Sequence, residues 1–294
     1  MRSLFCVLGD PVAHSRSPAL MSRAFGLLGV DAAYAPCRVL AEELPEAVRG
    51  LHALGARGFN VTVPHKTRVL ELCDRVAPEA ARIGAVNCVS REGGELVGHN
   101  TDAPGLLRAL RAAGVLPADG SKPAIDAVAV VGAGGSARAA ALSLAGPAKR
   151  LWILNRTASR AQALAQALRD SGAIADAAEL GSPQAEAALA EVGLVVHCST
   201  VGMGTSAVAF DVGRLDKGAA VVDLVYAGPP GSRAGDTSLL AAARGRGLRT
   251  VDGLDVLVHQ AIASLEIWLE RPHLDSLAAP LREAAAAPLP AEVR

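Results

Sequence analysis

One glycine-rich segment, Val128-Ala-Val-Val-Gly-Ala-Gly-Gly-Ser-Ala137, constrains the fold of this chain more than any other. It joins an apolar run, typical of a buried strand, to an alanine-rich stretch that predicts a helix. Gly132 permits the tight turn between them, and Gly134 lets the backbone approach a pyrophosphate with which a side chain would collide. The N–H groups at the start of the helix can bind the phosphates. The segment therefore predicts a dinucleotide-binding α/β domain rather than a plain strand–turn–helix connection.

The residues after the next expected strand indicate which dinucleotide binds. Enzymes that use NAD usually place an acidic residue here, on the adenosine ribose. This chain has Asn155 and Arg156 instead, and Arg160 follows one helical turn later. A guanidinium matches a 2′-phosphate, which a carboxylate would repel, and Thr157 can add a hydroxyl group and cap the next helix. We therefore expect NADP; the alternative is two solvated arginines on a surface loop.

Short runs rich in Val and Leu alternate with alanine-rich amphipathic stretches, a pattern typical of parallel sheets with crossover helices. We expect two α/β domains separated by a cleft, since 294 residues can form two cores and turn formers fill residues 116–123. The N-terminal α/β domain, 1–102, would bind the substrate and be completed by a returning helix at about 256–280. A Rossmann-type NADP-binding domain would span 103–255.

The expected elements follow from this alternation. Strands are expected at 4–8, 33–38, 58–61, 85–89, 127–131, 150–154, 194–197, 219–224 and 249–251. Helices are expected at 18–28, 42–54, 69–74, 103–114, 136–144, 159–171, 184–190 and 256–269. The last residues, 279–294, are rich in alanine and proline, and we expect them to be frayed or disordered.

The bulk composition argues against several classes of protein. The 29 basic and 29 acidic residues cancel, which gives no electrostatic reason to bind nucleic acid or an anionic membrane. No apolar run reaches the ~20 residues that span a bilayer. The 5 cysteines are scattered and lack paired spacing, which favours reduced thiols in a cytoplasmic protein over disulfides or a zinc site.

A lysine and an aspartate lie among neutral hydrogen-bonding residues in the first hundred positions. Lys66 ends the run Phe59-Asn-Val-Thr-Val-Pro-His-Lys66, and Asp102 ends Gly98-His-Asn-Thr-Asp102. One ammonium and one carboxylate among amides and hydroxyls suit a small polyhydroxylated substrate and a single proton transfer. The alternative is structural, with Lys66 capping a strand end and Asp102 starting a helix. The neutral groups, expected at or just after strand ends where α/β sheets bind ligands, are Asn60, Thr62, Asn87 and Thr101.

Two serines near the first expected helix form a candidate carboxylate site. Ser15 and Ser17 place hydroxyl groups at a helix N-terminus, where anions bind. Ser17 followed by Pro18 is also a strong helix-start signal, so Ser17 could be an N-cap only. For His14, His65 and His99, which lie near the same segments, we expect structural or supporting roles.

Taken together, these motifs resemble the shikimate dehydrogenase family, which reduces 3-dehydroshikimate with NADPH in aromatic amino-acid biosynthesis. The resemblance runs from near residue 5 to near residue 270. It rests on several motifs in one order: Ser15-Arg-Ser17, Asn60-Val-Thr-Val-Pro-His-Lys66, Gly84-Ala-Val-Asn87, Asn100-Thr-Asp102, Gly132-Ala-Gly-Gly135, Asn155-Arg-Thr157 and Gly253-Leu-Asp-Val-Leu-Val-His-Gln260.

The resemblance implies a role for each matching position. Lys66 and Asp102 would form the catalytic pair, with Ser15 and Ser17 on the substrate carboxylate. The remaining substrate residues would be Asn60, Thr62, Asn87, Thr101, Tyr226 and Gln260. The cofactor residues would be Gly132, Ala133, Gly134, Gly135, Ser136, Ala137, Asn155, Arg156, Thr157, Arg160, Leu224 and Gly253.

The chain departs from the family pattern at a few places. Asp255-Val256 stands where Gly-Met is usual, His197 stands where Asn is common, and the loop at 227–236 is long. These changes bear on cofactor affinity and substrate choice. Two other functions therefore stay open: a quinate/shikimate or aminoshikimate-pathway dehydrogenase, and a non-catalytic NADP-binding sensor. We expect a small-molecule substrate, a monomer or homodimer, and no nucleic-acid or membrane partner.

Overall fold

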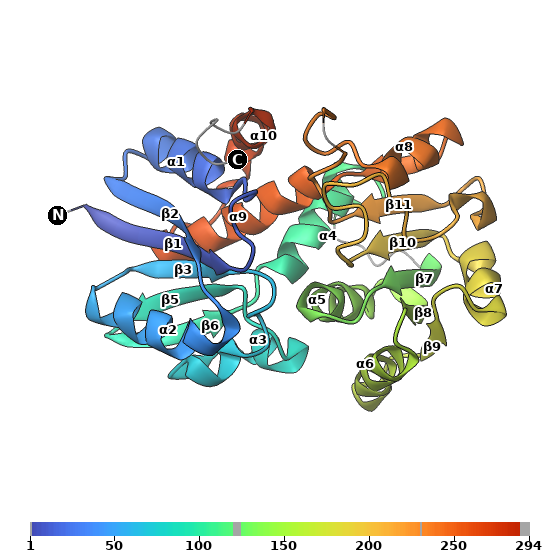
Figure 1. Cartoon of the computed structure of the whole chain (residues 1–294), viewed down its shortest axis with the longest axis horizontal. Coiled ribbons are helices and arrows are strands. Elements are labelled where there is room, and N and C mark those ends of the chain that lie inside the picture. The colour runs from blue at the N-terminus through green and yellow to red at the C-terminus, as the bar shows by residue number, and fades with distance from the viewer. Residues whose placement is uncertain (1, 120–124, 230, 289–294) are drawn as a thin grey trace. The chain divides into compact units, whose positions relative to one another are not determined.

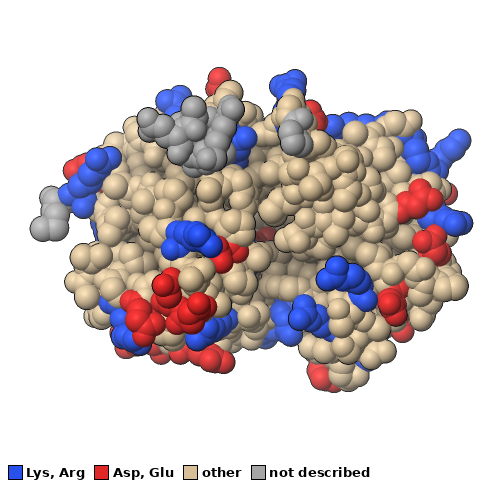
Figure 2. Space-filling model, in the orientation of Figure 1, with Lys and Arg blue, Asp and Glu red and all other residues tan. Residues whose placement is uncertain are grey.

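The computed structural model describes residues 2–119, 125–229 and 231–288, and the chain divides into two compact units (Figure 1). Unit 1 comprises Met1–Gly105 and Leu257–Arg294, and unit 2 comprises Leu106–Val256. The C-terminal segment therefore returns to the unit that contains the N-terminus. Each unit has its own six-stranded sheet. On the face that Figure 2 shows, Lys and Arg side chains are interspersed with Asp and Glu.

Unit 1 contains a mixed sheet in the order β2-β1-β3-β5-β6-β4. Its strands are β1 (Ser3–Gly9), β2 (Ala32–Arg38), β3 (Gly58–Val61), β4 (Arg75–Val76), β5 (Cys88–Glu92) and β6 (Glu95–His99). Its helices are α1 (Ser17–Leu28), α2 (Leu44–Ala53), α3 (Pro78–Ile83) and α10 (Ala278–Ala286), with short 3₁₀ turns η1 (Ala41–Glu43), η2 (Val69–Leu72) and η4 (Asp275–Leu277). Two further helices, α4 (Asp102–Ala112) and α9 (Gly253–Leu269), continue from one unit into the other.

The alternation of side chains along β1 divides the core of unit 1 between the two faces of its sheet. Cys6 and Leu8 pack on the face covered by α2, together with Val48. Phe5 points to the opposite face, where its ring lies 5.1 Å from that of Phe25 on α1 and 4.9 Å from that of Trp268 on α9. Helix α9, which closes the chain's return to unit 1, is therefore part of the core of this unit.

The sheet of unit 1 is not wholly parallel, so the prediction of parallel sheets is wrong for its second half. Strands β3 and β5 pair antiparallel, and so do β5 and β6. The cause is a two-residue hairpin, since Glu92 pairs with Glu95 across Gly93 and Gly94, whose φ angles are 59° and 98°. Two consecutive glycines at positive φ are a strong hairpin signal, and parallel strands cannot be joined by so short a turn.

Unit 2 contains the Rossmann-type sheet, whose strands all pair in parallel in the order β12-β11-β10-β7-β8-β9. The strands are β7 (Ile125–Val131), β8 (Ala148–Asn155), β9 (Ala175–Glu179), β10 (Leu194–His197), β11 (Ala220–Asp223) and β12 (Arg249–Val251). The helices are α5 (Gly135–Leu144), α6 (Ala158–Asp170), α7 (Pro183–Glu191) and α8 (Ser238–Gly245), with a 3₁₀ turn η3 (Val212–Arg214).

Strand β7 lies at the centre of this sheet and is apolar on both faces, as a parallel strand between two helical layers must be. Val128 and Val130 pack against α5 and α6, including Leu144. Ala129 and Val131 pack in a second cluster with residues of α7 and α8. The continuous apolar run before the glycine turn therefore predicted the position of this strand correctly.

Two other expectations about elements are wrong. Residues 279–294 are not frayed throughout, because α10 spans Ala278–Ala286 and buries Leu281 and Ala285; residues 289–294 lie outside the described residues. A sparse apolar stripe in an alanine-rich segment was enough to anchor this helix. The helix expected at 69–74 is only the 3₁₀ turn η2, since Cys73 already has an extended backbone.

Candidate active site

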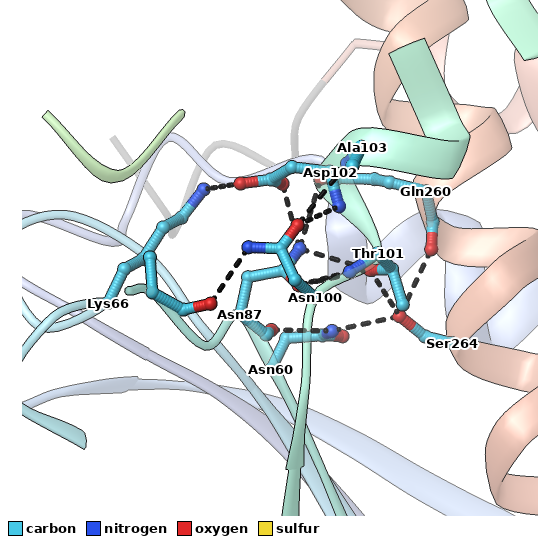
Figure 3. A network of polar contacts seen from close by, with 10 residues as sticks. Asn60, Lys66, Asn87, Asn100, Thr101, Asp102, Ala103, Gln260 and Ser264 are labelled. Carbon is cyan, nitrogen blue, oxygen red and sulfur yellow. Dashed lines mark hydrogen bonds and ion pairs between the residues drawn. The ribbon is translucent and has the colours of Figure 1, made fainter. Parts of the chain in front are cut away.

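A lysine and an aspartate of unit 1 form an ion pair that is only partly accessible to solvent (Figure 3). Lys66 lies in the loop after β3, and Asp102 is the first residue of α4. Lys66 Nζ donates to Asp102 Oδ2 at 2.6 Å, and the side chains are 12% and 10% exposed. Moving two charges this far from water is costly unless the other carboxylate oxygen also has a partner. The groups that hold Asp102 therefore decide whether the pair is stable.

Asn87 holds the second oxygen of this carboxylate. Its Nδ2 donates to Asp102 Oδ1 at 2.7 Å and lies 3.0 Å from Thr101 Oγ1 and 3.4 Å from Gln260 Oε1. Its Oδ1 accepts the backbone N–H of Thr101 at 2.6 Å. A backbone N–H can only donate and a carboxylate can only accept, so the orientation of the Asn87 amide is fixed from both ends. Both oxygens of Asp102 are thereby engaged, one by a cation and one by a neutral donor.

Asn100 places Asp102 by starting the helix. Its Oδ1 accepts the N–H of Asp102 at 3.1 Å and of Ala103 at 3.2 Å, while its Nδ2 donates to Ala85 O at 2.9 Å. This is the bonding of an N-cap residue. Asp102 therefore does start a helix, as the structural alternative holds. The cap is supplied by Asn100, however, which leaves the Asp102 carboxylate to pair with Lys66.

Not all of the neutral groups lie at or after strand ends, where the sequence pattern predicts them. Thr62 follows β3 directly and Thr101 follows β6, but Asn60 lies within β3 and Asn87 precedes β5. Because β5 runs antiparallel to β3, its start lies beside the end of β3, and Val61 N donates to Asn87 O at 2.9 Å. Asn87, which precedes β5, therefore lies at the same edge of the sheet as Thr62, which follows β3.

Two partners of Asn60 are absent from the sequence predictions. Tyr34 on β2 donates its hydroxyl to Asn60 Oδ1 at 2.8 Å, and Asn60 Nδ2 donates to Ser264 Oγ on α9 at 3.1 Å. Ser264 lies one helical turn after Gln260, so the spacing of four residues was an available signal. Nothing in the sequence pointed to Tyr34, because β1 separates its strand from β3.

Ser15 and Ser17 lie at the start of α1. The prediction that Ser17 caps this helix is wrong, since Arg16 occupies the N-cap position and no side chain caps the helix. Ser15 Oγ instead accepts the N–H of Ser17 at 3.3 Å. The helix begins at Ser17 with Pro18 in its first turn, where a missing N–H is harmless. The Ser17 hydroxyl is thus not used as a helix cap.

The histidines near these segments have local partners. His65 is buried, and its Nε2 lies 2.7 Å from Val39 O. His99 Nε2 lies 2.9 Å from Ser90 Oγ. Burial lowers the pKa of His99 and also that of His14, which favours the neutral form of both imidazoles. In the part of the chain that the structure describes, no group of three or more His, Cys, Asp or Glu could hold a metal ion.

The glycine turn of unit 2 has the geometry that a pyrophosphate requires. Gly132 has φ +129°, and a Cβ on it would lie 3.2 Å from the carbonyl carbon of Cys198. Gly134 is the N-cap of α5, and a Cβ built there would meet nothing within 4 Å. Open space therefore lies in front of the helix N-terminus, where phosphates bind. The turn also lies between β7 and β10, where the strand order reverses and Rossmann folds bind their ligand.

The segment after β8 presents two cationic side chains. Arg156 and Arg160 are both exposed, and neither forms an ion pair with another residue of the described ranges. Asn155 Nδ2 donates to the carbonyl of Thr157 at 3.0 Å, and Thr157 is the N-cap of α6, although its side chain makes no capping bond. Two guanidiniums beside a helix N-terminus, with no carboxylate between them in sequence, fit a phosphate.

Three further cofactor and substrate candidates lie around the start of α9. A Cβ on Gly253 would lie 2.6 Å from Leu224 O, so only glycine permits this approach. Leu224 N donates to His197 O at 3.0 Å, and Gly235 N donates to Tyr226 O at 2.8 Å, which closes the long loop. All of these residues lie at the carboxyl edge of the unit 2 sheet, as the glycine turn does.

Two departures from the family pattern have physical explanations. Asp252 Oδ1 accepts the N–H of Leu254 at 2.9 Å and of Asp255 at 3.0 Å, which caps α9. Asp255 lies in the first turn, where a carboxylate interacts favourably with the helix dipole. His197, where Asn is common, is buried and pairs with Asp223 at 2.8 Å.

Comparisons with known proteins show which family the chain is similar to. Residues 7–89 match the family model described as the shikimate dehydrogenase substrate binding domain. The chain is 44% identical over 272 residues to shikimate dehydrogenase (NADP(+)) of Symbiobacterium thermophilum, covering 90% of this chain and 88% of the relative.

Solved structures give the same result. Shikimate 5-dehydrogenase from Thermus thermophilus, in complex with NADP(H) and shikimate, superposes with a TM-score of 0.80 at 36% identity, covering 96% of this chain and 98% of that one. The ligand-free 5-ketofructose reductase of a Gluconobacter species superposes with a TM-score of 0.79 at 33% identity, covering 96% and 98%. On these relationships, the chain belongs to the shikimate dehydrogenase family.

Proposed function

We propose that this protein is a shikimate dehydrogenase, which interconverts 3-dehydroshikimate and shikimate with NADP(H) in the biosynthesis of aromatic amino acids. The observation that carries the proposal is the largely buried Lys66–Asp102 pair, held at 2.6 Å among amide and hydroxyl groups, in a chain with 44% identity to a shikimate dehydrogenase (NADP(+)). A charge pair at the edge of water can act on a substrate oxygen, whereas a non-catalytic sensor would need neither charge.

Lys66 is the proposed proton donor and alkoxide stabiliser. An ammonium carries three N–H donors, and the bond to Asp102 fixes where the group sits. As the carbonyl of 3-dehydroshikimate is reduced, negative charge develops on its oxygen, and a fixed ammonium stabilises that charge without reorganising. Lys66 then donates the proton that completes the hydroxyl group. Bound NADPH supplies the hydride.

Asp102 and its neighbours are proposed to hold the ring. Asp102 keeps Lys66 in place and can accept a bond from a ring hydroxyl beside the reacting one. Thr62, Asn87 and Gln260 offer neutral donors and acceptors at the same edge of unit 1. Ser15 and Ser17, at the start of α1, are proposed to bind the substrate carboxylate, since the Ser17 hydroxyl does not cap the helix.

NADP rather than NAD is the proposed cofactor. The open space at Gly134 would receive the pyrophosphate, and Arg156 with Arg160 would bind the 2′-phosphate. Asn155 stands where NAD enzymes usually have an acidic residue, so no carboxylate repels that phosphate. Binding of NADP by unit 2 therefore follows from its own residues as well as from the family.

The proposal also includes a location in the cytoplasm. All five cysteines are free, as they are in reducing compartments. No helix in the described part of the chain is both long and apolar enough to cross a membrane.

Nicotinamide absorbance tests the proposal directly. The purified chain would be given shikimate, quinate or fructose, each with NADP or NAD. We expect turnover with shikimate and NADP to exceed every other combination in kcat/KM. Faster turnover of quinate would make the chain a quinate dehydrogenase, and NADP-dependent oxidation of fructose would match the reaction class of the Gluconobacter neighbour. No turnover with any combination would favour a sensor.

A further inference from the structure

Ser264 is a hydroxyl residue in a position where an apolar residue would be expected. It lies in the middle of α9, is 0% exposed, and is surrounded in sequence by buried Ile262, Ala263 and Leu265. Serine favours the interior of a helix less than alanine does, and a buried hydroxyl is costly unless it is hydrogen-bonded. The helix itself therefore gains nothing from this side chain.

The hydrogen bonds of Ser264 connect helix α9 to Asn60 and Thr101. Its hydroxyl donates to Gln260 O at 3.0 Å, which uses its only hydrogen. Ser264 Oγ can then accept from Asn60 Nδ2 at 3.1 Å and from Thr101 Oγ1 at 3.2 Å. Thr101 Oγ1 in turn accepts from Asn87 Nδ2 at 3.0 Å, and its own hydrogen has two acceptors within reach, Ser264 Oγ and Asn87 Oδ1, the latter at 3.3 Å. The other hydrogen of Asn87 Nδ2 points to Asp102 Oδ1.

Asn60, the other side-chain neighbour of Ser264, uses both of its amide hydrogens in hydrogen bonds within the protein. Its two amide hydrogens go to Ser264 Oγ and to Asn87 O, each at 3.1 Å. Its Oδ1 accepts from the hydroxyl of Tyr34 at 2.8 Å, so the amide cannot flip without breaking all three bonds. Asn60 thus bonds both to the backbone of Asn87 and to the Ser264 hydroxyl that contacts Thr101, rather than presenting its donors to a ligand.

The backbone keeps these groups in register. On α9, Ser264 and Trp268 lie four residues apart on one face, and on β3, Asn60 and Gly58 lie two residues apart on one face. A Cβ on Gly58 would overlap the Trp268 indole, whose Nε1 donates to Val89 O at 2.9 Å. Trp268 therefore fits over Gly58 as Ser264 fits over Asn60, and sliding of the helix would break both contacts.

We propose that Ser264 and Tyr34 are positioning residues for the catalytic pair. Ser264 acts through Thr101 and Asn87 on Asp102, and Tyr34 acts through Asn60; Figure 3 shows the part of this network from Asn60 to Lys66. The inference rests on the proposed function, and it assigns Asn60 to the support of the site rather than to a ring hydroxyl. Loss of either hydroxyl would loosen Asp102, and with it Lys66, without removing any of the neutral groups that face the substrate.

Steady-state kinetics of Ser264→Ala and Tyr34→Phe test this proposal. For Ser264→Ala we expect kcat to fall by about ten- to a hundredfold, the effect of a small misplacement of reacting groups, with KM for shikimate changed less than threefold. Tyr34→Phe, which acts on Asp102 only through Asn60, should lower kcat less. Ser90→Ala is the matched control, because Ser90 is also buried in unit 1 but bonds to Glu92 and His99 instead.

A double-mutant cycle separates positioning from general damage. Thr101→Val breaks the same path, so the Ser264→Ala/Thr101→Val double variant should lose no more kcat than the worse single variant. Additive losses, or a Ser264→Ala kcat within twofold of wild type, would overturn the inference. Trp268 fluorescence and thermal unfolding should stay near wild type in both single variants; a large loss of either would mean a merely structural role. If the wild-type chain does not oxidise shikimate, the proposed function fails and this inference fails with it.

Discussion

Each unit contains a carboxylate deep in a polar network, and the two networks end differently. In unit 1, Asp102 pairs with Lys66 at 2.6 Å, and both side chains keep about a tenth of their surface exposed, at 10% and 12%. In unit 2, Asp223 pairs with His197 at 2.8 Å, and the side chains are only 2% and 1% exposed. Both networks pair an aspartate with a basic residue, whereas the exposed fraction of the paired side chains differs.

In unit 2, the hydrogen bonds of Asp223 and His197 go to other groups of the protein. Besides His197 Nδ1, Asp223 accepts from Thr237 Oγ1 at 2.6 Å and from Val225 N at 3.0 Å. His197 Nε2 lies 2.6 Å from Ser199 Oγ. Ser199, His197 and Asp223 thus follow one another as in a hydrolytic triad, yet these bonds join the ends of β10 and β11 to each other and to the start of α8. The exposed fraction of the side chains, rather than their residue types, therefore distinguishes the proposed catalytic pair of unit 1 from the buried pair of unit 2.

The largest effect should come from replacing the lysine. Lys66→Met keeps the length of the side chain and removes its charge, so we expect kcat to fall by about a thousandfold or more, as for loss of a general acid that also stabilises charge. The KM for shikimate should change little. Lys149→Met is the matched control, because Lys149 also pairs with an aspartate at 2.6 Å but is 64% exposed. A Lys66→Met enzyme within tenfold of wild type would remove Lys66 from the mechanism.

Replacing the buried aspartate of unit 2 should mainly cost stability. Asp223→Ala strips His197, Thr237 and Val225 of their acceptor, and removal of one partner from a buried charged network typically costs about 3–5 kcal/mol. Urea unfolding would measure the loss. Asp216→Ala is the control, because the Asp216 side chain is exposed and accepts from the backbone N–H of Gly218. An unchanged unfolding free energy for Asp223→Ala would show that the network of unit 2 is not architectural.

A smaller effect is expected where α4 and α9 touch. A Cβ on Gly105 would lie 2.7 Å from Gln260 N and 2.8 Å from its Cα, so Gly105→Ala must push the two helices apart. Overpacking of this kind costs about 1–3 kcal/mol and would move Gln260 relative to Asn87. Gly26→Ala in α1 is the control, since a Cβ there meets nothing within 4 Å. Equal unfolding free energies for the two variants would contradict the close helix contact.

The smallest effect concerns the cofactor. Arg156→Gln should raise KM for NADP by about tenfold, the loss of one charge-assisted bond, and leave KM for NAD unchanged. Arg249→Gln is the control, because Arg249 is an exposed arginine of unit 2 that donates to Gly114 O. A parallel change for both cofactors would place Arg156 away from the 2′-phosphate.

Local signals in the sequence were enough for the scaffold of unit 2 and for the two charged residues. The turn at Gly132 is visible because strand, glycines and helix are consecutive, and β7 and α5 lie where the pattern predicts them. Lys66 and Asp102 are 36 residues apart; their residue types among neutral polar groups point to one site, and the family resemblance implies that they form a catalytic pair. Their 2.6 Å contact depends on the antiparallel strands β5 and β6, which the parallel prediction missed.

The supporting residues could not be predicted for a physical reason. Ser264 is 204 residues from Asn60 and 163 from Thr101, and no pattern of local periodicity links such positions. The sequence pattern places Asp223 at the end of a strand and gives no reason for a buried carboxylate. The reason is its pairing with His197, 26 residues earlier in the chain. Ser17 was misassigned as a cap because the N-cap preference describes types of residue, whereas Arg16 held the position through backbone geometry alone.

Measuring kcat and the free energy of unfolding for Lys66→Met and Asp223→Ala side by side tests most directly whether the two pairs have different roles. We expect Lys66→Met to lose about a thousandfold in kcat at near wild-type stability. We expect Asp223→Ala to lose about 3–5 kcal/mol of stability while its kcat, per folded molecule at saturating NADP, stays within tenfold of wild type. A Lys66→Met protein that turns over normally, or an Asp223→Ala protein that is stable but loses as much kcat as Lys66→Met should, would show that the roles do not differ in this way.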